Sequence, residues 1–349
     1  MALQQASLPT VAVAQPRTHT TPRPVTGLPR VSVVLVNYRQ WAKTAAVVRQ
    51  LLEAHALRRG DAEVVIVDNH SPRHPLARKL RRLPGVSLRR WDKNHGFARA
   101  VNEGCRLSQG KWSLLLNPDI TLSEGFLDGV LELTHRLETD DARAGIVGFH
   151  LRNPDGSQQL SAGPFPTFWR TLARLALSRS RRKYQALRGA ARCPAPWVTG
   201  CCLLVRRACW EELGGLDEDF FLYYEDVDLC RRARQAGWTV QYEPSLALVH
   251  HFPLHNRPLP TSLRLATRHS LLTYARKHWP GWQYRWLARL VRVESAWRKL
   301  FAWWRGDQRQ VEHYRELSRM ARELQRRQPE AARRRLDRAL ERLDVRVGV

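Results

Sequence analysis

No stretch of this 349-residue sequence stays apolar for the roughly 18–20 residues that a helix needs to cross a bilayer. We therefore do not expect an integral membrane protein.

Residues 1–29 contain five prolines but neither the basic nor the apolar segment of a secretory signal, so we predict a disordered tail there. The six cysteines form no Cys-x-x-Cys pair and lack the histidine spacing typical of a zinc site. Because most of them lie in apolar runs, we expect buried free thiols in a reducing compartment.

Acidic residues are scarce relative to basic ones. The chain has 32 Asp and Glu against 58 Lys and Arg, which gives a formal net charge of +26. No acid occurs between Asp155 and Glu211, whereas residues 170–192 hold eight basic side chains. Such a charge favours a polyanionic partner, either nucleic acid, an anionic membrane or a phosphorylated substrate. We find no known nucleic-acid-binding module, so a basic nucleic-acid-binding protein is the weaker alternative.

Short apolar, β-branched segments alternate with helical patterns in the first half of the chain. This alternation predicts an α/β fold in which helices flank a mostly parallel sheet. Ligands of such sheets bind beyond the carboxyl ends of the strands, where Asn37, Asp68 and Asp119 fall. The strands are predicted at 31–37, 63–68, 86–91 and 112–116, with helices to about 55 and from the glycine-containing loop at 94–96 to Gly110.

The second half is less regular. Residues 146–151 and 198–205 are predicted strands, separated by a basic insertion at 164–192. After about Pro260 the pattern is helical, with one break at Pro329. The predicted organisation is therefore a tail (1–29), an α/β domain (30–260) and a C-terminal helical region (261–349).

An aromatic stripe runs along residues 282–304. Seven large apolar side chains recur near one face of a predicted helix, with Arg and Lys between them. Three interpretations remain open: packing against the α/β domain, docking on a bilayer surface, or contact between copies of the chain. The stripe consists of Trp282, Trp286, Leu290, Val293, Trp297, Phe301 and Trp304.

Residues 214–238 place two adjacent acids after an aromatic run. The run 220–224 is predicted to be extended, and Glu225 and Asp226 follow it at the start of a helix that Gly237 ends. We expect Asp226 to be the N-cap of this helix. A carboxylate held there below aromatic side chains is suited to act as a general base. An ordinary capping acid before a surface helix is the alternative.

Six segments in one order resemble glycosyltransferase family 2, whose GT-A fold is Rossmann-like. The similarity covers about residues 30–255 and is greatest to the rhamnosyltransferase-like branch, which decorates bacterial cell-surface polysaccharide precursors. The segments are VSVVLVNYR, VDNHS, NHGFARAVN, LLLNPD, VTGCCLLVRR and FFLYYEDVDLCRRARQAGW.

The resemblance implies an inverting, metal-dependent transferase that moves a sugar from a nucleoside-diphosphate sugar to a hydroxyl of a lipid-linked or cell-surface glycan precursor. A dTDP- or UDP-sugar is the implied donor, with rhamnose favoured over galactofuranose, mannose and N-acetylglucosamine. The enzyme is expected in the cytoplasm, peripherally bound to the inner face of the plasma membrane. The oligomeric state is not predicted.

The resemblance also implies roles for single residues. Asp226 matches the catalytic base, and Glu225 would hold acceptor hydroxyls or orient its loop. Asp68 matches the acid that contacts the base or ribose of the nucleotide, although an aspartate that only forms a turn is the alternative. The remaining donor-binding positions are Asn37, Asn94, Gly96, Asn102 and Asn117, together with Asp119.

A site for Mg²⁺ or Mn²⁺ is implied at the metal-binding motif of the family. Asn117 replaces its first acid, so Asp119 is left as the main carboxylate ligand, bridged by the ion to the diphosphate. His250 matches the histidine that completes the site in relatives, and the adjacent His251 remains an alternative. Thr199 and Gly200, with the two arginines at 206–207, match either an acceptor-side strand or a plain core strand.

Overall fold

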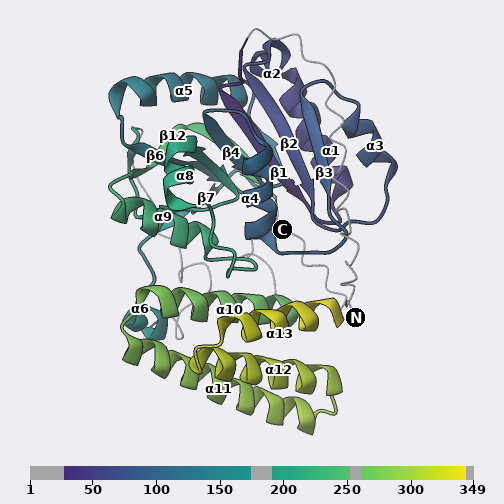
Figure 1. Ribbon diagram of the computed structural model, residues 1–349, viewed down its shortest axis with the longest axis vertical. Helices are drawn as coiled ribbons and strands as arrows, with labels where there is room; N and C mark the ends of the chain where they lie inside the picture. The colour runs from purple at the N-terminus through teal and green to yellow at the C-terminus, as the bar shows by residue number, and fades with distance from the viewer. Residues whose placement is uncertain (1–26, 174–190, 252–260, 343–349) are drawn as a thin grey trace, which may run out of the picture.

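The computed structural model describes residues 27–173, 191–251 and 261–342. Most of the predicted tail and of the basic insertion therefore lies outside the described residues. Figure 1 shows a twisted sheet between helices, with a layer of long helices stacked beneath it. None of the helices in the described part of the chain is both long and apolar enough to cross a bilayer. All six cysteines are free, and five of them are buried.

The first half of the sheet is parallel, as predicted. Strands β3, β2, β1 and β4 lie side by side in that order. The central residues of β1, β2 and β4 are buried, which matches continuous apolar runs covered by helices on both faces, whereas the edge strand β3 is partly exposed. The strands are β1 (Val31–Asn37), β2 (Ala62–Asp68), β3 (Val86–Arg90) and β4 (Trp112–Leu116), and the helices between them are α1 (Trp41–Glu53), α2 (His55–Arg59), α3 (Pro75–Arg81) and α4 (Phe97–Leu107).

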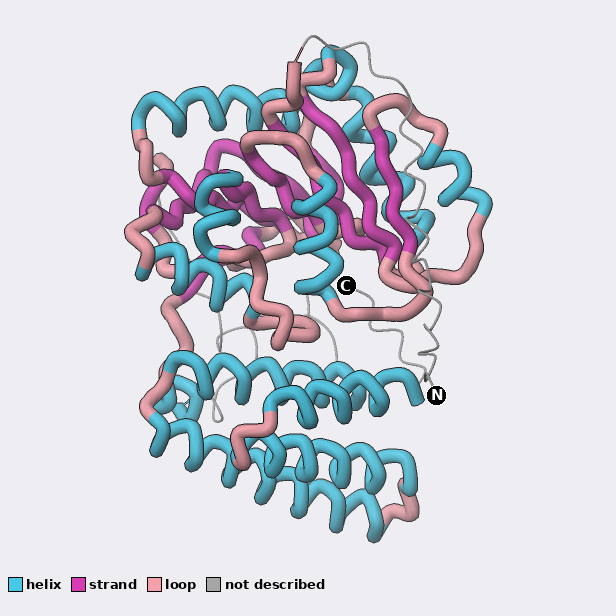
Figure 2. The backbone as a smooth tube through the Cα atoms, in the orientation of Figure 1, coloured by secondary structure: helices cyan, strands magenta, loops and turns pink. Residues whose placement is uncertain are grey.

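The second half of the sheet is mixed. β11 is antiparallel to both β4 and β6, whereas β12 is parallel to β6 and pairs with the short antiparallel β5. The elements are β5 (Ile120–Leu122), α5 (Phe126–Asp140), β6 (Ala144–Arg152), β7 (Gln158–Gln159), β8 (Ala162–Gly163), α6 (Phe168–Ala173), β9 (Cys193–Pro194), β10 (Trp197–Val198), β11 (Cys202–Arg206), α8 (Arg207–Leu213), α9 (Glu225–Gln235) and β12 (Thr239–His250). β8 and β10 pair with each other in a separate two-stranded sheet. Figure 2 shows the strands in the upper part of the molecule, among the helices.

The predicted single strand at 198–205 is wrong in its middle. The structure has two strands, β10 and β11, separated by a turn at 199–201. The turn leaves the ladder because the N–H of Thr199 donates to the Ser161 carbonyl and the N–H of Gly200 donates to the Asp226 carboxylate. Arg206 lies opposite Trp112 at the amino end of β4, and its guanidinium donates to carbonyls at 137–142. Arg207 donates to the Ser108 and Gly110 carbonyls, so both arginines bond to backbone carbonyls of neighbouring segments.

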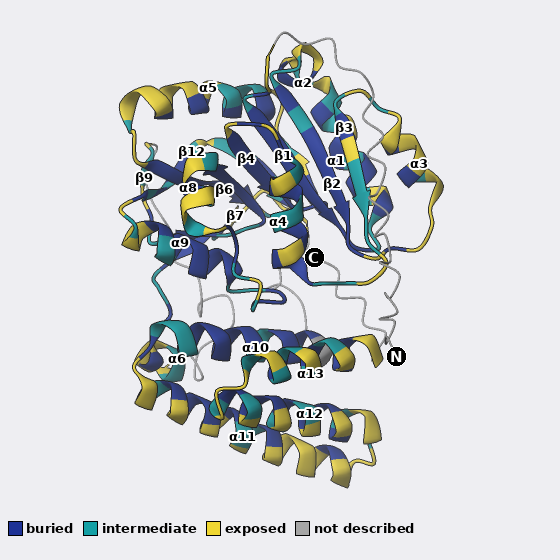
Figure 3. Ribbon diagram, in the orientation of Figure 1, coloured by how far each residue is buried: buried dark blue, intermediate teal, exposed yellow. Residues whose placement is uncertain are grey.

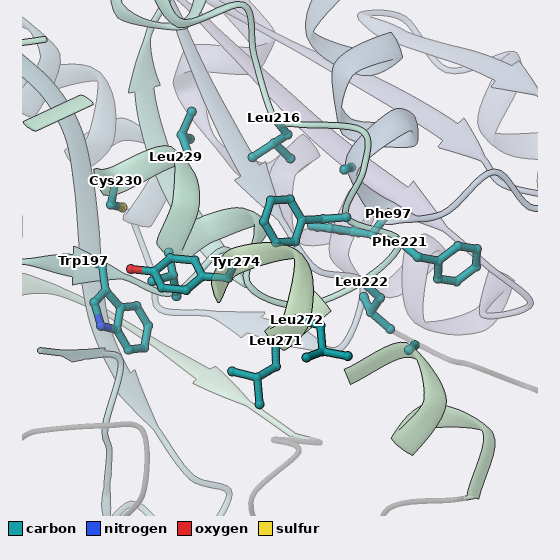
Figure 4. Close-up of a cluster of buried hydrophobic side chains, with 14 of the residues drawn as sticks. Phe97, Trp197, Leu216, Phe221, Leu222, Leu229, Cys230, Leu271, Leu272 and Tyr274 are labelled. Carbon is teal, nitrogen blue, oxygen red and sulfur yellow. The ribbon is translucent and has the colours of Figure 1, made fainter. Parts of the chain in front are cut away.

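Four helices follow β12: α10 (Thr261–His278), α11 (Gly281–Trp304), α12 (Gln308–Gln325) and α13 (Pro329–Arg342). α10 lies between the α/β layer and the other three (Figure 1). One continuous cluster of buried side chains includes Phe97, Phe221 and Leu222 of the α/β part together with Leu272 and Tyr274 of α10 (Figure 4). The helical region thus shares its core with the α/β domain.

The aromatic stripe of α11 does not pack in this core. All seven of its predicted members are at least 39% exposed, whereas Leu287, Val291 and Ala302 on the other side of the helix are buried. Figure 3 shows α12 and α10 on the buried side of α11. The interpretation that the stripe packs against the α/β domain is therefore wrong. The buried apolar face of the helix is a different one, and it packs mainly against α12 and α10.

Candidate active site

The carboxyl ends of β1 and β2 hold Asn37 and Asp68, which face each other in the parallel register and are both fully buried. The Asn37 amide donates to Asp68 Oδ1 at 2.8 Å, and the Arg90 guanidinium donates to Oδ2 at 2.8 Å. Asp68 therefore accepts from side chains on both oxygens, so it does more than form a turn. A carboxylate has about four acceptor sites, which leaves room for a ligand N–H or hydroxyl.

Asn69 organises the neighbouring loop and was given no role by sequence reasoning, although it lies in the VDNHS segment. Its amide donates to Asn94 Oδ1 at 2.8 Å and to the Gly96 carbonyl, and its Oδ1 accepts from the N–H of His95. The Asn94 side chain in turn accepts from the N–H of Gly96. These bonds hold the loop before α4 beside Asp68.

Gly96 has a left-handed φ of 92° and lies against Phe221. A Cβ atom there would stand 2.8 Å from the Phe221 carbonyl oxygen, so no other residue fits without a backbone shift. The contact is completed by α13, whose Arg333 donates to the His95 carbonyl at 2.7 Å. Sequence reasoning linked this glycine to nucleotide approach, and the structure adds a packing reason for it.

Asn102 lies in the middle of α4, away from Asp68. Its side chain forms two hydrogen bonds with the backbone of Leu216, in the loop before the aromatic run. Nδ2 donates to the Leu216 carbonyl at 2.8 Å, and Oδ1 accepts from the Leu216 N–H at 2.9 Å. This asparagine therefore connects α4 to the segment that carries Glu225 and Asp226, and its predicted contact with the nucleotide stays a prediction.

Asp119 and His250 meet at the end of β4. His250 Nε2 lies 3.5 Å from Asp119 Oδ1, and both side chains are almost fully buried. The adjacent His251 points elsewhere, with Nε2 at 2.8 Å from Thr121 Oγ1. The structure thus places His250 beside Asp119 and separates His251 from it, as opposite faces of a strand require. Asn117 lies next to them, with its N–H bonded to the Cys201 carbonyl at 2.9 Å.

The Asp119–His250 pair has the properties of a cation site. Within the described residues, the buried Oδ1 of Asp119 has no hydrogen-bond donor. Burial alone would raise the pKa of Asp119, but the nearby His250 ring and the charge of Lys43 hold that pKa below its usual value. The described part of the chain has no cluster of three or more His, Cys, Asp or Glu that could enclose a metal. Two protein ligands suit Mg²⁺ or Mn²⁺, because these ions keep water and substrate phosphates as their other ligands.

Gln159 sets the orientation of the His250 ring and was not found from the sequence, because no motif marks the short strand β7. The Gln159 amide lies 2.9 Å from His250 Nδ1, and the buried Gln159 Oε1 has no partner among the described residues. If the O and N atoms of the Gln159 amide are exchanged, Oε1 accepts a hydrogen bond from the Nδ1–H of His250 and is no longer without a partner. In that tautomer Nε2 carries the lone pair that a metal ligand needs, and a cation between Nε2 and Asp119 would replace the ring proton that otherwise faces the carboxylate.

Asp226 is the second residue of α9, and its N-cap is Tyr224. The predicted capping role is therefore wrong. Instead, Oδ2 of Asp226 accepts from the Gly200 N–H at 3.0 Å and Oδ1 accepts from the Val227 N–H at 2.8 Å. Glu225, the first residue of the helix, is also buried. The turn at 199–201 thus fixes the direction of the Asp226 carboxylate.

The aromatic run before Asp226 is a turn and not the extended segment that was predicted. Tyr223 and Tyr224 both have a φ of 70°, which is uncommon for bulky residues. Buried contacts hold this strained backbone, because the Phe221 carbonyl accepts from the Phe97 N–H and the Leu222 carbonyl accepts from Ser270 of α10. The strained turn delivers the two acids to the start of α9.

Cys201 connects the two acidic sites. Burial, followed by the charge of Asp119 and then that of Asp226, raises the pKa of its thiol well above the usual value. The Asn117 N–H donates to the Cys201 carbonyl and the Gly200 N–H donates to Asp226, so the segments that carry Asp119 and Asp226 both bond to the turn at 199–201, although more than 100 residues separate the two acids in the sequence. The carboxyl end of β4 and the start of α9 consequently form one site.

Asp228 anchors this helix to α10. Helical spacing predicts an ion pair between Asp228 and Arg231, but the structure pairs Asp228 with Arg232 at 2.7 Å, His278 at 2.7 Å and Lys277 at 2.8 Å. Arg231 turns toward Tyr274 instead. Asp228 is fully buried, and although burial alone would raise its pKa, the bonds from His278, Arg232 and Lys277 lower the pKa to about 2.

Replacing Asp228 with asparagine should destabilise the fold by at least about 2 kcal/mol at pH 7, since its folded pKa of about 2 lies below the unfolded value of about 3.9. A depressed pKa means that the stabilisation is complete above about pH 4 and is lost as the pH falls toward 2. The free energies of unfolding of wild type and variant should therefore converge over that range. The control is Glu330→Gln, which removes a carboxylate that is 84% exposed and paired with Arg334. It should change the free energy of unfolding by less than about 0.5 kcal/mol. A constant difference between pH 7 and pH 2 would contradict this assignment.

Comparison with known proteins agrees with this geometry. A sequence model described as glycosyltransferase-like family 2 matches residues 29–271. An N-acetylglucosaminyl-diphospho-decaprenol L-rhamnosyltransferase of Mycobacterium tuberculosis is 31% identical over 240 residues, which cover 63% of this chain and 76% of that protein. A low-salt glycan biosynthesis hexosyltransferase of Haloferax volcanii is 25% identical over 259 residues, covering 69% of this chain and 73% of the relative.

The fold has a counterpart among solved structures. A crystal structure of GalNAc-T7 with UDP, GalNAc and Mn²⁺ superposes with a TM-score of 0.54 at 18% identity, covering 71% of this chain and 48% of that one. The likeness supports the predicted GT-A-like sheet with helices on both faces. Together with the family match over more than half of the chain, it leads to one identification: the chain belongs to glycosyltransferase-like family 2.

Proposed function

We propose that this chain is a metal-dependent, inverting glycosyltransferase that moves a sugar from a nucleoside-diphosphate sugar to a hydroxyl of a lipid-linked glycan precursor. The proposal is supported by the turn at 199–201, whose backbone bonds to Asn117, next to the Asp119–His250 pair, and to Asp226. One acidic centre is then available for the leaving diphosphate and another for the attacking hydroxyl.

The donor nucleotide would bind beyond the carboxyl ends of β1 and β2. Asp68, held by Asn37 and Arg90, would accept from the base or the ribose. The loop that Asn69 and Asn94 order would lie along the nucleotide, next to the start of α4, where backbone N–H groups favour phosphate.

Asp119 and His250 would hold Mg²⁺ or Mn²⁺ together with oxygens of the diphosphate, and Asn117 would lie beside them. When bound, the ion neutralises the negative charge that develops on the leaving diphosphate. The orphaned Oδ1 of Asp119 and the buried position of both side chains support this assignment.

Asp226 would accept the proton of the acceptor hydroxyl as that oxygen attacks the anomeric carbon on the face opposite the diphosphate. One displacement inverts the configuration at this carbon, and no covalent intermediate with the enzyme is needed. Glu225, next to it at the start of α9, would hold an acceptor hydroxyl. The two backbone N–H bonds that fix Asp226 support its role, because a general base works only within hydrogen-bond reach of its proton.

Rhamnose is the favoured donor sugar because relatives from Mycobacterium tuberculosis and Escherichia coli are named rhamnosyltransferases; the latter is 25% identical over 157 residues, covering 45% of this chain and 58% of that protein. The name of the mycobacterial relative also supports a polyprenyl-diphosphate-linked acceptor. From such an acceptor we infer that the enzyme works in the cytoplasm, bound peripherally to the inner face of the plasma membrane. Galactofuranose, mannose and N-acetylglucosamine are the alternative sugars.

Thermal unfolding with a panel of nucleoside diphosphates and their sugars, each with and without Mn²⁺, tests this proposal. A ligand at 100 times its Kd stabilises the folded state by about 2.7 kcal/mol, which raises the Tm by several degrees. We expect such a rise with one nucleotide class, and only when Mn²⁺ is present. Equal Tm values with every nucleotide would contradict the proposal, and salt-dependent retention on DNA in the same protein would then favour the nucleic-acid-binding alternative.

A further inference from the structure

α11 carries an apolar face that no described part of the chain covers. Six of its aromatic side chains are at least 46% exposed, and Trp297 and Trp304 reach 69% and 76%. Large exposed apolar patches are rare on proteins that work alone in water. We call this surface the aromatic face; it consists of Trp282, Trp286, Trp297, Phe301, Trp303 and Trp304.

The position of the aromatic face on the helix is regular. At about 100° per residue, five of the six side chains fall within an arc of about 100°, and Trp303 lies about 60° outside that arc. The buried residues Leu287, Val291 and Ala302 lie on the opposite side, toward α12. α11 is therefore apolar on two sides, and its outer side is turned away from the sheet (Figures 1 and 3).

A second element extends the aromatic face. Trp169 of α6 is 64% exposed and lies with its ring centroid 6.4 Å from that of Trp282. The buried Phe168 contacts both rings and Trp279. Two segments more than 100 residues apart in the sequence thus place their tryptophans on one surface, which argues against chance exposure at the end of a helix.

Basic side chains line one edge of the aromatic face. Arg285, Arg289 and Lys299 form no salt bridge with the described part of the chain, and the Arg289 guanidinium lies 5.4 Å from the Trp286 ring centroid. The single acid of α11, Glu294, lies off this edge and is already bonded to Arg268 and Arg298. The edge is therefore cationic and available to an anionic partner.

We propose that α11, together with Trp169, is an interfacial helix that lies in the plane of an anionic lipid bilayer. Tryptophan favours the boundary between headgroups and acyl chains, and a flanking row of Arg and Lys binds anionic headgroups. A second copy fits less well, because two such faces would bring together surfaces without a free carboxylate in molecules of formal charge +26. Anionic lipid is complementary to both the apolar and the cationic part.

The proposed docking helix is connected to the candidate base through α10. α10 lies between α11 and α9, and its Lys277 and Ser270 bond Asp228 and the Leu222 carbonyl on either side of Glu225 and Asp226. Docking through α11 would thus set a fixed height of Asp226 above the lipid surface. That consequence relies on the proposed function, whereas the docking surface itself does not.

Vesicle flotation of the full chain with phosphatidylglycerol or phosphatidylcholine vesicles tests the proposal. The combined variant Trp297→Ala, Phe301→Ala, Trp304→Ala should reduce partitioning onto phosphatidylglycerol at least tenfold, with an unchanged Tm because these side chains are exposed. Arg285→Glu with Arg289→Glu should abolish the preference for the anionic vesicle. The matched control, Arg81→Glu with Arg82→Glu at the end of α3, makes the same charge change away from α11 and should bind as wild type does.

Undiminished binding by the aromatic variant, or an equal loss in the α3 control, would overturn the proposal. A wild-type dimer that the aromatic variant turns into a monomer, without vesicle binding by either, would assign the face to a second copy. Vesicle binding is measured without sugar transfer. Binding that depends on α11 in a protein that no nucleotide stabilises would leave the docking surface in place and remove only the proposed function.

Discussion

The change of Asp226 to asparagine should lower the rate of sugar transfer by about 10²–10⁴-fold, the range that a positioned general base contributes. Asparagine has nearly the same shape but cannot take up the acceptor proton. It has one acceptor oxygen for the two N–H groups of Gly200 and Val227, so a loss of stability of about 1 kcal/mol should accompany the change.

Transfer to a lipid-linked acceptor and thermal stabilisation by the donor nucleotide, measured on the same protein, check this prediction. Nucleotide binding should persist, because Asp226 lies at the acceptor side of the proposed site. The control Glu211→Gln changes a 66% exposed carboxylate on α8 and should transfer at the wild-type rate. Transfer by the Asp226 variant within about threefold of wild type would remove the base role from this residue.

The second large effect is expected at Asp119. Asp119→Ala removes the carboxylate that faces His250, and it should abolish the Mn²⁺-dependent tightening of nucleoside-diphosphate binding and slow transfer by at least about 10²-fold. Titration of the nucleotide with and without Mn²⁺, followed by calorimetry, measures the tightening directly.

The neighbouring histidines provide a matched pair for this test. His250→Ala should weaken the Mn²⁺ effect about 10–100-fold, whereas His251→Ala changes an adjacent residue whose ring lies at Thr121 and should leave it unchanged. Equal effects of the two changes would relocate the second metal ligand. Retention of the full Mn²⁺ effect in Asp119→Ala would move the whole ion site.

Much of the site framework follows from local sequence patterns. The apolar runs before Asn37, Asp68 and Asp119 predict parallel strands, and a parallel sheet brings their carboxyl ends to one edge. Asp226 was a candidate base from its place between an aromatic run and a helix as well as from the resemblance to a family, whereas His250 came from the resemblance alone. Both residues come near the sheet edge because β12 and α9 carry them there. These two elements are placed by contacts between residues far apart in the sequence, which local patterns do not show.

Residues that act through tertiary contacts could not be predicted. Gln159 reaches His250 from a two-residue strand, and the partners of Asp228 lie about 50 residues away on α10. The spacing of charges along α9 favoured Arg231 as the partner of Asp228. Helical periodicity describes contacts within one helix only, so it could not show the partners on α10. The same limit applies to α11. Its sequence shows an apolar stripe, but only packing against other helices decides that the face with Leu287 is buried and the face with Trp286 is exposed.

The continuous core beneath the active site has a consequence for how the chain folds. Leu272 and Tyr274 of α10 pack with Phe221 and Leu222 in the same buried cluster (Figure 4), so the strained turn before Glu225 has its apolar support on a helix that begins at residue 261. A fragment that ended with the α/β part would expose this apolar surface to water and lose the contacts that hold Tyr223 and Tyr224 at positive φ. Because the two layers share this core, we expect them to unfold together. We also expect the turn before Glu225 to reach its folded geometry only after α10 has been synthesised.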